Sequence, residues 1–280
     1  MPTDLDACGR YALSCQTDEG GFCFYSDPTW SVEVPNAPDT CAAIGILALR
    51  TIPVPRVEQC TAWLRSLQDA DGEYPMLIVG YSALRALRVL RLAPRLEPRP
   101  YLCGWLDRFA ASALPTDIPE GWLTSAARCV ELCLACELEL TQEMRAGIAT
   151  LLQRSRSETG GYGAPGPSLP DSARALTLAN AVGLALDDEI LAYARQCEHE
   201  PFGFNITPFA TSSSLETQHA GLTIMLSCGE RPRNPSVIRA YVASCQSSRG
   251  GFGRAPGAIP RLDDSLRALQ ILSSLDDPGP

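Results

Sequence analysis

Two adjacent carboxyl groups, Asp263 and Asp264, stand near the end of the chain in the stretch Arg261-Leu262-Asp263-Asp264-Ser265. They open a run whose apolar residues have helical spacing. A carboxyl group in apolar surroundings has a raised pKa, and a second carboxylate beside it raises that pKa further. Such a pair keeps one proton available for a weakly basic group, for example an alkene.

Both acids also have non-catalytic interpretations. Asp264 at a helix start suits an N-cap, and Asp263 just before it would be solvated in a loop. A guanidinium from Arg261 beside Asp263 favours the ionised form of that carboxyl and weakens it as an acid. Alternatively, Arg261 with Arg254 or Arg267 would grip a diphosphate beside helix N-termini, where anions are favoured.

The order of parts around the acid pair recurs along the chain. Each copy has a helical run ending in glutamine, a glycine turn with an aromatic residue, a loop, and then an acid followed by a hydroxyl residue. The glutamines and turns are Gln16 with Gly20-Gly21-Phe22, Gln68 with Gly72-Glu73-Tyr74, Gln153 with Gly160-Gly161-Tyr162, Gln196 with Gly203-Phe204, and Gln246 with Gly250-Gly251-Phe252. The acid and hydroxyl pairs are Asp39-Thr40, Asp171-Ser172, Glu216-Thr217 and Asp264-Ser265.

These copies predict six units of about 40 to 48 residues, a length typical of two-helix repeats. In each unit the acid would cap the second helix, and glycine with a positive φ would end the first. The second helices are richer in alanine and apolar residues, so we expect them to pack inside. Six pairs closing into a ring would make one all-α domain, an α6/α6 barrel over residues 1–280.

The composition excludes several classes of function. The net charge is −9 and all 23 basic residues are arginines, so nucleic acid is not an expected partner and lysine Schiff-base chemistry is absent. The acidic N-terminal segment lacks an apolar run, and no run approaches the ~20 residues that span a bilayer, so we expect a cytoplasmic protein. The 12 cysteines are scattered through helical runs, which favours reduced, buried thiols.

No metal site is expected from the ligand-type residues. Cys129, Cys133 and Cys136 lie on one face of an apolar helical run, where a buried cysteine stripe is favoured. The chain has two histidines, His199 and His219, which leaves too few ligands for a catalytic zinc site.

The repeated glutamine, glycine-aromatic turn and acid-hydroxyl helix start resemble the repeat of the prenyltransferase and squalene-cyclase superfamily. The resemblance covers essentially the whole chain and implies the α6/α6 barrel. It also implies that the second helices start around the mouth of a central apolar cavity, which suits an isoprenoid. The implied substrate-binding residues are Phe24, Tyr25, Trp30, Asp39, Trp122, Asp171, Phe204, Phe209, Glu216, His219, Arg254, Arg261 and Arg267. For the turn residues Phe22, Tyr162 and Phe252, a wedge between neighbouring repeats is favoured instead.

Two activities of that superfamily leave different marks on the sequence. The β subunits of protein prenyltransferases hold zinc with an aspartate, a cysteine and a histidine of a His-Thr pair, and here Asp264-Ser265 stands in the place of that pair. Type II terpene cyclases carry an Asp-x-Asp-Asp motif at the same position, and here Arg261 replaces the first aspartate. No zinc is therefore expected, and magnesium only if the substrate carries a diphosphate.

The resemblance favours a type II terpene cyclase acting on a polyprenyl or prenylated substrate, with Asp263 as the proton donor and Asp264 orienting it. Prenyl transfer by a divergent β-like subunit is the alternative enzyme. A non-catalytic barrel that binds isoprenoids or serves a partner chain is the alternative outside catalysis, since type II cyclases usually place their site between two barrels. Expected partners are the isoprenoid and a second barrel subunit or another copy, with peripheral membrane contact left open.

Overall fold

The computed structural model describes residues 3–24, 34–110, 121–185 and 188–276, and these are mostly helical. Two short strands, β1 (Glu198–His199) and β2 (Gly203–Phe204), pair as an antiparallel hairpin. The helices are α1 (Leu5–Ser14), α2 (Ala37–Leu49), α3 (Val57–Ser66), α4 (Leu77–Val89), α5 (Arg99–Ala110), α6 (Trp122–Ala135), α7 (Gln142–Ser155), α8 (Leu169–Val182), α9 (Asp188–Gln196), α10 (Leu215–Ser227), α11 (Pro235–Ser244) and α12 (Leu262–Asp276).

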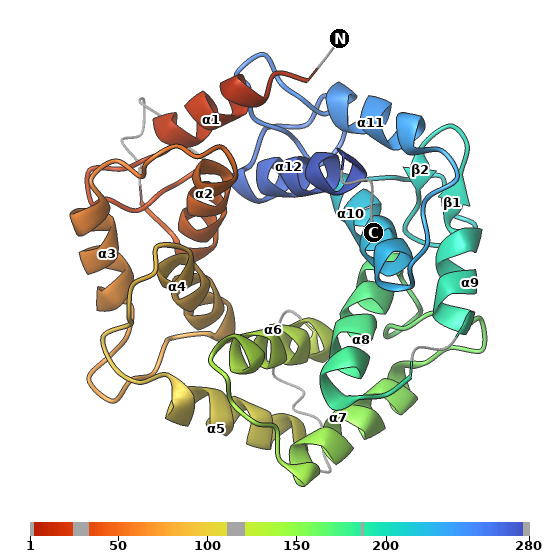
Figure 1. The fold of residues 1–280 in the computed structure, drawn as a ribbon, viewed down its shortest axis with the longest axis horizontal. Coiled ribbons are helices and arrows are strands. Elements are labelled where there is room, and N and C mark those ends of the chain that lie inside the picture. Colours follow the sequence, from red (N-terminus) through yellow and green to blue (C-terminus); the bar gives the residue numbers. More distant parts are fainter. Residues whose placement is uncertain (1–2, 25–33, 111–120, 186–187, 277–280) are drawn as a thin grey trace. The chain divides into compact units, whose positions relative to one another are not determined.

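The chain divides into two compact units, and each has two layers of helices. The first unit joins Met1–Glu97 to Arg239–Pro280, and the second is Pro98–Ile238. In the first unit α2 packs against α4 and α12, while α1 and α3 cover α2 and α4 (Figure 1). In the second unit α8 packs against α6 and α10, with α7 and α9 outside them. Within each unit the second helix of every pair therefore packs against other second helices, as the sequence predicts.

Small residues let these second helices approach one another. A Cβ atom added to Gly45 of α2 would lie 3.0 Å from the side chain of Leu266 on α12. Ile44, Ile46 and Leu47 of α2 are fully buried. Contacts of this kind form the core, because apolar surface removed from water stabilises the fold by about 25 cal/mol per Å².

The glycine turns bring the backbone close to the next outer helix. Gly20, Gly160 and Gly250 have φ of +93°, +82° and +94°. A Cβ atom on Gly20 would lie 2.6 Å from the backbone nitrogen of Cys60. The positive φ is confirmed, but the glycine does not end the helix as expected, because α1 already ends at Ser14.

In the first unit, the glutamine that recurs in the repeat ties its glycine turn to the following outer helix through hydrogen bonds. Gln246 donates from Nε2 to the carbonyl of Gly250 (2.9 Å) and to that of Asp4 (2.7 Å). In return Gln246 Oε1 accepts from the backbone N–H of Asp4 at 2.9 Å. The last repeat is thereby joined to the first. Gln16 and Gln68 donate in the same way, to Pro55 and Leu96.

Gln153 and Gln196 lie in the last turns of α7 and α9, before their glycine turns, as the sequence predicts. The residues that pair with the turn aromatics of the second unit are others: Arg156 pairs with Tyr162, and Glu198 pairs with Phe204. Arg156 forms an ion pair with Glu189. Glu198 accepts from the backbone N–H of Arg233. Charged side chains therefore make the link to the next outer helix that glutamine makes in the first unit.

The acids do not cap the second helices, which corrects another expectation. The N-caps are Asn36 of α2, Ser168 of α8 and Ser214 of α10. Asp39 and Asp171 lie within the first helical turn, where their backbone N–H groups bind the capping side chains. An acid there also interacts favourably with the helix dipole.

The hydroxyl residue that follows the acid has a separate role. The backbone N–H of Phe22 donates to Thr40 Oγ1 at 2.9 Å, and the N–H of Phe252 donates to Ser265 Oγ at 2.8 Å. The N–H of Tyr162 binds Ser172 Oγ likewise at 3.0 Å. This bond fixes these three glycine turns on the starts of α2, α8 and α12. In the turn before α10, the N–H of Phe204 instead donates to Gln218 Oε1 at 3.1 Å.

Replacing Gly250 by alanine tests the turn. We expect a loss of about 2 kcal/mol or more in the free energy of unfolding, because the positive φ is strained for alanine and the new Cβ would lie 2.4 Å from the carbonyl oxygen of Ala7. Gly257→Ala is the matched control, since Gly257 has φ +78° but nothing within 4 Å of an added Cβ. It should lose about 1 kcal/mol or less in urea unfolding. Equal losses for the two variants would contradict the close approach.

Candidate functional site

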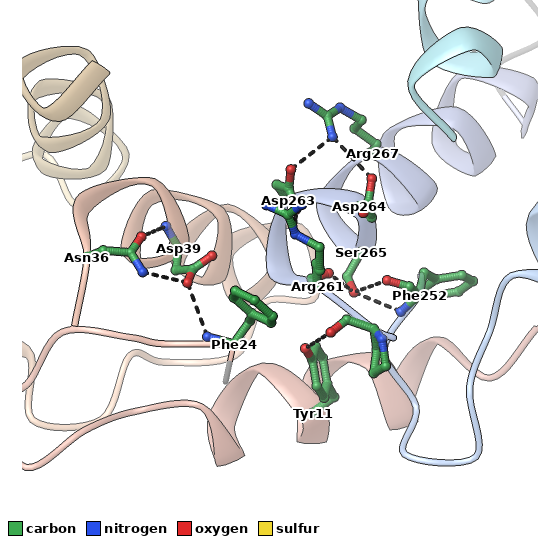
Figure 2. A network of polar contacts seen from close by, with 11 residues as sticks. Tyr11, Phe24, Asn36, Asp39, Phe252, Arg261, Asp263, Asp264, Ser265 and Arg267 are labelled. Carbon is green, nitrogen blue, oxygen red and sulfur yellow. Dashed lines mark hydrogen bonds and ion pairs between the residues drawn. The ribbon is translucent and has the colours of Figure 1, made fainter. Parts of the chain in front are cut away.

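The start of α12 is held by contacts on both sides of the acid pair. The carbonyl of Arg261 accepts from the N–H of Ser265 (2.9 Å) and from its Oγ–H (2.7 Å). On the preceding residue, the carbonyl of Pro260 accepts from the hydroxyl of Tyr11 at 2.9 Å. Figure 2 shows these contacts beside the carboxyl groups. The backbone that carries Asp263 and Asp264 is therefore fixed to α1 and to the glycine turn.

Asp264 is the buried member of the pair, with 3% of its side chain exposed. Its Oδ1 accepts from Arg267 Nη1 at 3.2 Å. Burial is the main reason that the pKa of Asp264 rises to about 6, and the charge of Asp263 raises it further against the opposing guanidinium groups of Arg267 and Arg261. A carboxyl group with such a pKa carries a proton under mildly acidic conditions and remains a moderately strong acid.

Asp263 has more exposure and more positive charge around it. Its side chain is 33% exposed. Arg261 Nε lies 3.4 Å from Oδ1, and Arg267 Nη1 lies 3.1 Å from Oδ2. Each oxygen of Asp263 therefore forms an ion pair with a guanidinium group.

A third carboxyl group, Asp39 of α2, lies close enough to Asp263 to be affected by its charge. Asp39 is buried, and its Oδ2 accepts from Asn36 Nδ2 at 2.7 Å and from the N–H of Phe24 at 3.2 Å. Burial raises the pKa of Asp39, the two hydrogen bonds oppose the rise, and the charge of Asp263 adds to it. We call Asp39, Asp263, Asp264, Arg261 and Arg267 the carboxyl cluster (Figure 2).

Phe24 links the two sides of the carboxyl cluster. Its backbone N–H binds Asp39, and the Cζ atom of Arg261 lies 5.3 Å from the centroid of its ring. Arg254 lies exposed on the loop before α12. Two further predicted binding residues, Tyr25 and Trp30, lie outside the described residues.

The second unit builds a related cluster from the same sequence pattern. Arg174 binds Asp171 Oδ1 (2.8 Å) within α8 and Glu216 Oε1 (3.0 Å) on α10. Asp171 also accepts from Ser168 Oγ at 2.9 Å. Its side chain is 27% exposed, in contrast to the 3% of Asp264. The two predicted acids meet here through an arginine that was not among the predicted residues.

The sequence did carry a signal for Arg174. The residues from Asp171 to Leu176 read Asp-Ser-Ala-Arg-Ala-Leu, and those from Asp264 to Leu269 read Asp-Ser-Leu-Arg-Ala-Leu. Arg174 and Arg267 therefore occupy the same place in their repeats. Each lies one helical turn after the acid, where opposite charges attract.

The remaining predicted residues of the second unit have diverse surroundings. Phe204 is fully buried, and a Cβ atom on Gly221 of α10 would lie 2.3 Å from its ring, so it wedges the turn against that helix. Phe22 and Phe252 of the first unit are likewise fully buried, whereas Tyr162, for which the same wedge role was predicted, is partly exposed. Phe209 is 93% exposed. Trp122 begins α6 and His219 lies on α10, and both are partly exposed.

The histidine, cysteine and acidic side chains of the described residues bear on the expectation that the chain has no metal site. Among the described residues, no group of three or more histidine, cysteine, aspartate or glutamate side chains is placed to hold a metal ion. All twelve cysteines are free thiols, and Cys129 and Cys133 are buried in α6 as predicted. Cys136, the third residue of the predicted buried stripe, follows the end of α6 and is only partly buried. Within the described part of the chain, no helix has the length and apolar character needed to cross a membrane.

The raised pKa of Asp264 predicts a pH-dependent stability. The folded protein binds the proton more tightly than the unfolded chain, so the free energy of unfolding falls as pH rises from about 4 to above 6. We expect this fall to be smaller in Asp264→Asn than in the parent, by up to about 3 kcal/mol. Urea unfolding at a series of pH values measures it. Asp276→Asn, an exposed site on the same helix, gives the general effect of removing one carboxylate, and identical pH slopes for parent and Asp264→Asn would contradict the burial argument.

Comparison with known proteins places this architecture. The family model for the prenyltransferase alpha-alpha toroid domain matches residues 2–93 and 218–278, more than half of the chain. A search of curated protein sequences found no match.

Solved structures share the fold at low identity. Candida albicans protein geranylgeranyltransferase-I complexed with GGPP matches with a TM-score of 0.70 and 14% identity, over 99% of this chain and 93% of that one. Type II terpene cyclase MstE from Scytonema in complex with geranylgeranyl dihydroxybenzoate matches with a TM-score of 0.66 and 12% identity, over 97% of this chain and 96% of that one. The predicted all-α toroid fold is thereby confirmed, and the chain belongs to the prenyltransferase alpha-alpha toroid family.

Proposed function

We propose that this chain is an acid-initiated terpene cyclase acting on a polyprenyl or prenylated substrate, with Asp264 as the proton donor. The observation that carries the proposal is a buried carboxyl group, Asp264, beside a second carboxyl group that two guanidinium groups hold. This reverses the roles expected from the sequence, where Asp263 was the donor and Asp264 its partner. The reversal follows from burial and from the charges around each oxygen.

The chemistry requires a group that keeps its proton until an alkene arrives. Protonated Asp264 would transfer its proton to one alkene carbon, leaving a carbocation on the other. Arg267, 3.2 Å from Asp264 Oδ1, would stabilise the carboxylate that forms. Ring closure follows as further alkenes attack the cation, and loss of a proton from the final cation makes the product an isomer of the substrate.

The surroundings of Asp264 suit this step electrostatically. A carboxyl group with a pKa of about 6 still gives up its proton far more readily than water does. It is also partly protonated close to neutral pH. An aromatic face such as the ring of Phe24 would stabilise a passing cation by about 0.5 to 2 kcal/mol. Because the guanidinium group of Arg261 stacks on the ring of Phe24, a substrate cation would compete with that group for the face of the ring.

The substrate class is proposed from the solved relatives. One of them binds geranylgeranyl dihydroxybenzoate and another binds GGPP, so a long prenyl chain is common to both. At 12% and 14% identity these structures support the fold, and the prenyl chain is carried to this protein as a proposal only. Arg261 and Arg267 already form ion pairs within the carboxyl cluster, with Asp263 and Asp264, which makes the cluster poorly suited to a diphosphate.

Prenyl transfer is the second candidate, since a geranylgeranyltransferase shares the fold across nearly the whole chain. The two reactions differ in what they release. Cyclisation of a prenyl chain gives a product of unchanged mass, whereas prenyl transfer from GGPP releases diphosphate and adds the prenyl mass to an acceptor. A barrel that only binds isoprenoids would give neither product.

Incubation with geranylgeranyl-bearing alcohols, aromatic acids and diphosphates, followed by mass spectrometry and chromatography, tests these candidates. We expect a product of substrate mass with a new retention time. Asp264→Asn should lower kcat/KM by about 10² to 10⁴-fold, because the amide has no transferable proton. The parent rate should fall as pH rises above about 6, where Asp264 ionises.

Asp276→Asn, at the exposed end of the same helix, is the matched control and should retain the parent rate. Diphosphate release with an enlarged acceptor would favour prenyl transfer instead. An Asp264→Asn variant with full cyclase turnover would overturn the assignment of the donor.

A further inference from the structure

One oxygen of Asp263 depends on Arg261 for its compensation. Asp263 Oδ1 is inaccessible to solvent and accepts no hydrogen bond from the described residues. The Nε atom of Arg261 lies 3.4 Å away, in an ion pair. A buried carboxylate oxygen without a hydrogen bond is costly unless an opposite charge stabilises it. Arg261 is therefore the group that compensates for the burial of that oxygen.

Arg261 is itself held in place from three sides. Its backbone N–H donates to the carbonyl of Phe252 at 3.0 Å, and its carbonyl accepts from Ser265. Its guanidinium group stacks at 5.3 Å from the ring centroid of Phe24, and Phe24 is anchored to Asp39. A surface arginine without such contacts would sample many rotamers. The contacts of Arg261 restrict its side chain to a position beside Asp263.

We infer that Arg261 is a positioning residue, whose ion pair with Asp263 makes the acid pair asymmetric and thereby localises its proton on Asp264. Two adjacent carboxyl groups in matching surroundings share one proton, and the titration then belongs to the pair instead of to either residue. Here Asp263 forms ion pairs with Arg261 and Arg267, whereas Asp264 forms one, with Arg267. The inference rests on the proposed function only for its catalytic consequence.

Other charged and titratable groups surround the acid pair in the first unit. Asp39 reaches it from α2, and Arg267 lies on α12 itself. Tyr11 lies on α1 near Asp39, and Cys245, just after α11, feels the charge of Asp264. All four groups remain when Arg261 alone is changed, so a difference between parent and variant reports the contribution of Arg261.

Carbon-13 NMR of the full chain, labelled at the aspartate Cγ atoms, tests the inference without requiring any substrate. Asp264→Asn and Asp263→Asn identify the two resonances. In the parent, the Cγ signal of Asp264 should titrate in one step. In Arg261→Gln its midpoint should rise by about one pH unit, because an opposing positive charge is lost.

Two further variants keep the test independent of simple misfolding. Arg261→Lys retains the charge and should return the midpoint of Asp264 to within about half of the shift. Phe24→Leu retains every charge but removes the stacking face, and should move the midpoint in the same direction as Arg261→Gln by a smaller amount. Arg249→Gln, an exposed site in the preceding glycine turn, is the control and should leave the midpoint unchanged.

An unchanged Asp264 midpoint in a folded Arg261→Gln variant overturns the inference. If the midpoint shifts as expected but no prenyl substrate is turned over by the parent, the positioning role of Arg261 stands and the proposed function fails. If turnover occurs with the expected pH dependence while Arg261→Gln leaves the midpoint unchanged, the reverse holds.

Discussion

A hydrogen bond from the turn aromatic to the first turn of the second helix fixes the starts of α2, α8 and α12. The N–H of Phe22, Tyr162 or Phe252 binds the hydroxyl of Thr40, Ser172 or Ser265. The acid precedes that hydroxyl directly in sequence, so the same bond fixes the position of its carboxyl group. A repeated structural contact thus brings an acid to an equivalent place in several repeats. Chemistry then depends on what surrounds each one.

The copies around Asp171 and Asp264 illustrate that dependence. Both acids are followed by serine and, one helical turn later, by an arginine that binds them. Asp171 receives an additional hydrogen bond from Ser168 and keeps more solvent exposure. Asp264 is almost wholly buried next to a second carboxyl group. Solvent and hydrogen bonds stabilise a carboxylate and their removal favours the neutral acid, so the same motif gives a structural ion pair in one place and a candidate proton donor in the other.

Much of this arrangement could be predicted from the sequence, because the repeat sets it locally. The helix pairs, the positive φ of the turn glycines and the burial of Phe22 and Phe252 follow from short patterns. The capping residues were missed although Ser168-Leu169-Pro170-Asp171 has the spacing of a helix start, with serine three residues before the acid. The difference in burial between Asp263 and Asp264 could not be predicted, since it depends on how α12 packs on α1 and α2. Nor could the exchange of glutamine for Arg156 and Glu198, because an ion pair across a turn leaves no fixed spacing in the sequence.

The reciprocal bonds between Gln246 and Asp4 join groups 242 positions apart. The first unit is therefore assembled from both ends of the chain, and the carboxyl cluster needs Asp39 from one end and Asp264 from the other. During synthesis α2 leaves the ribosome long before α12, the helix that covers it. Its apolar face must wait unburied, or be held by other surfaces, until α12 is translated. A chain interrupted before α12 therefore carries Asp39 without Asp263 and Asp264, the carboxyl groups that accompany it in the fold.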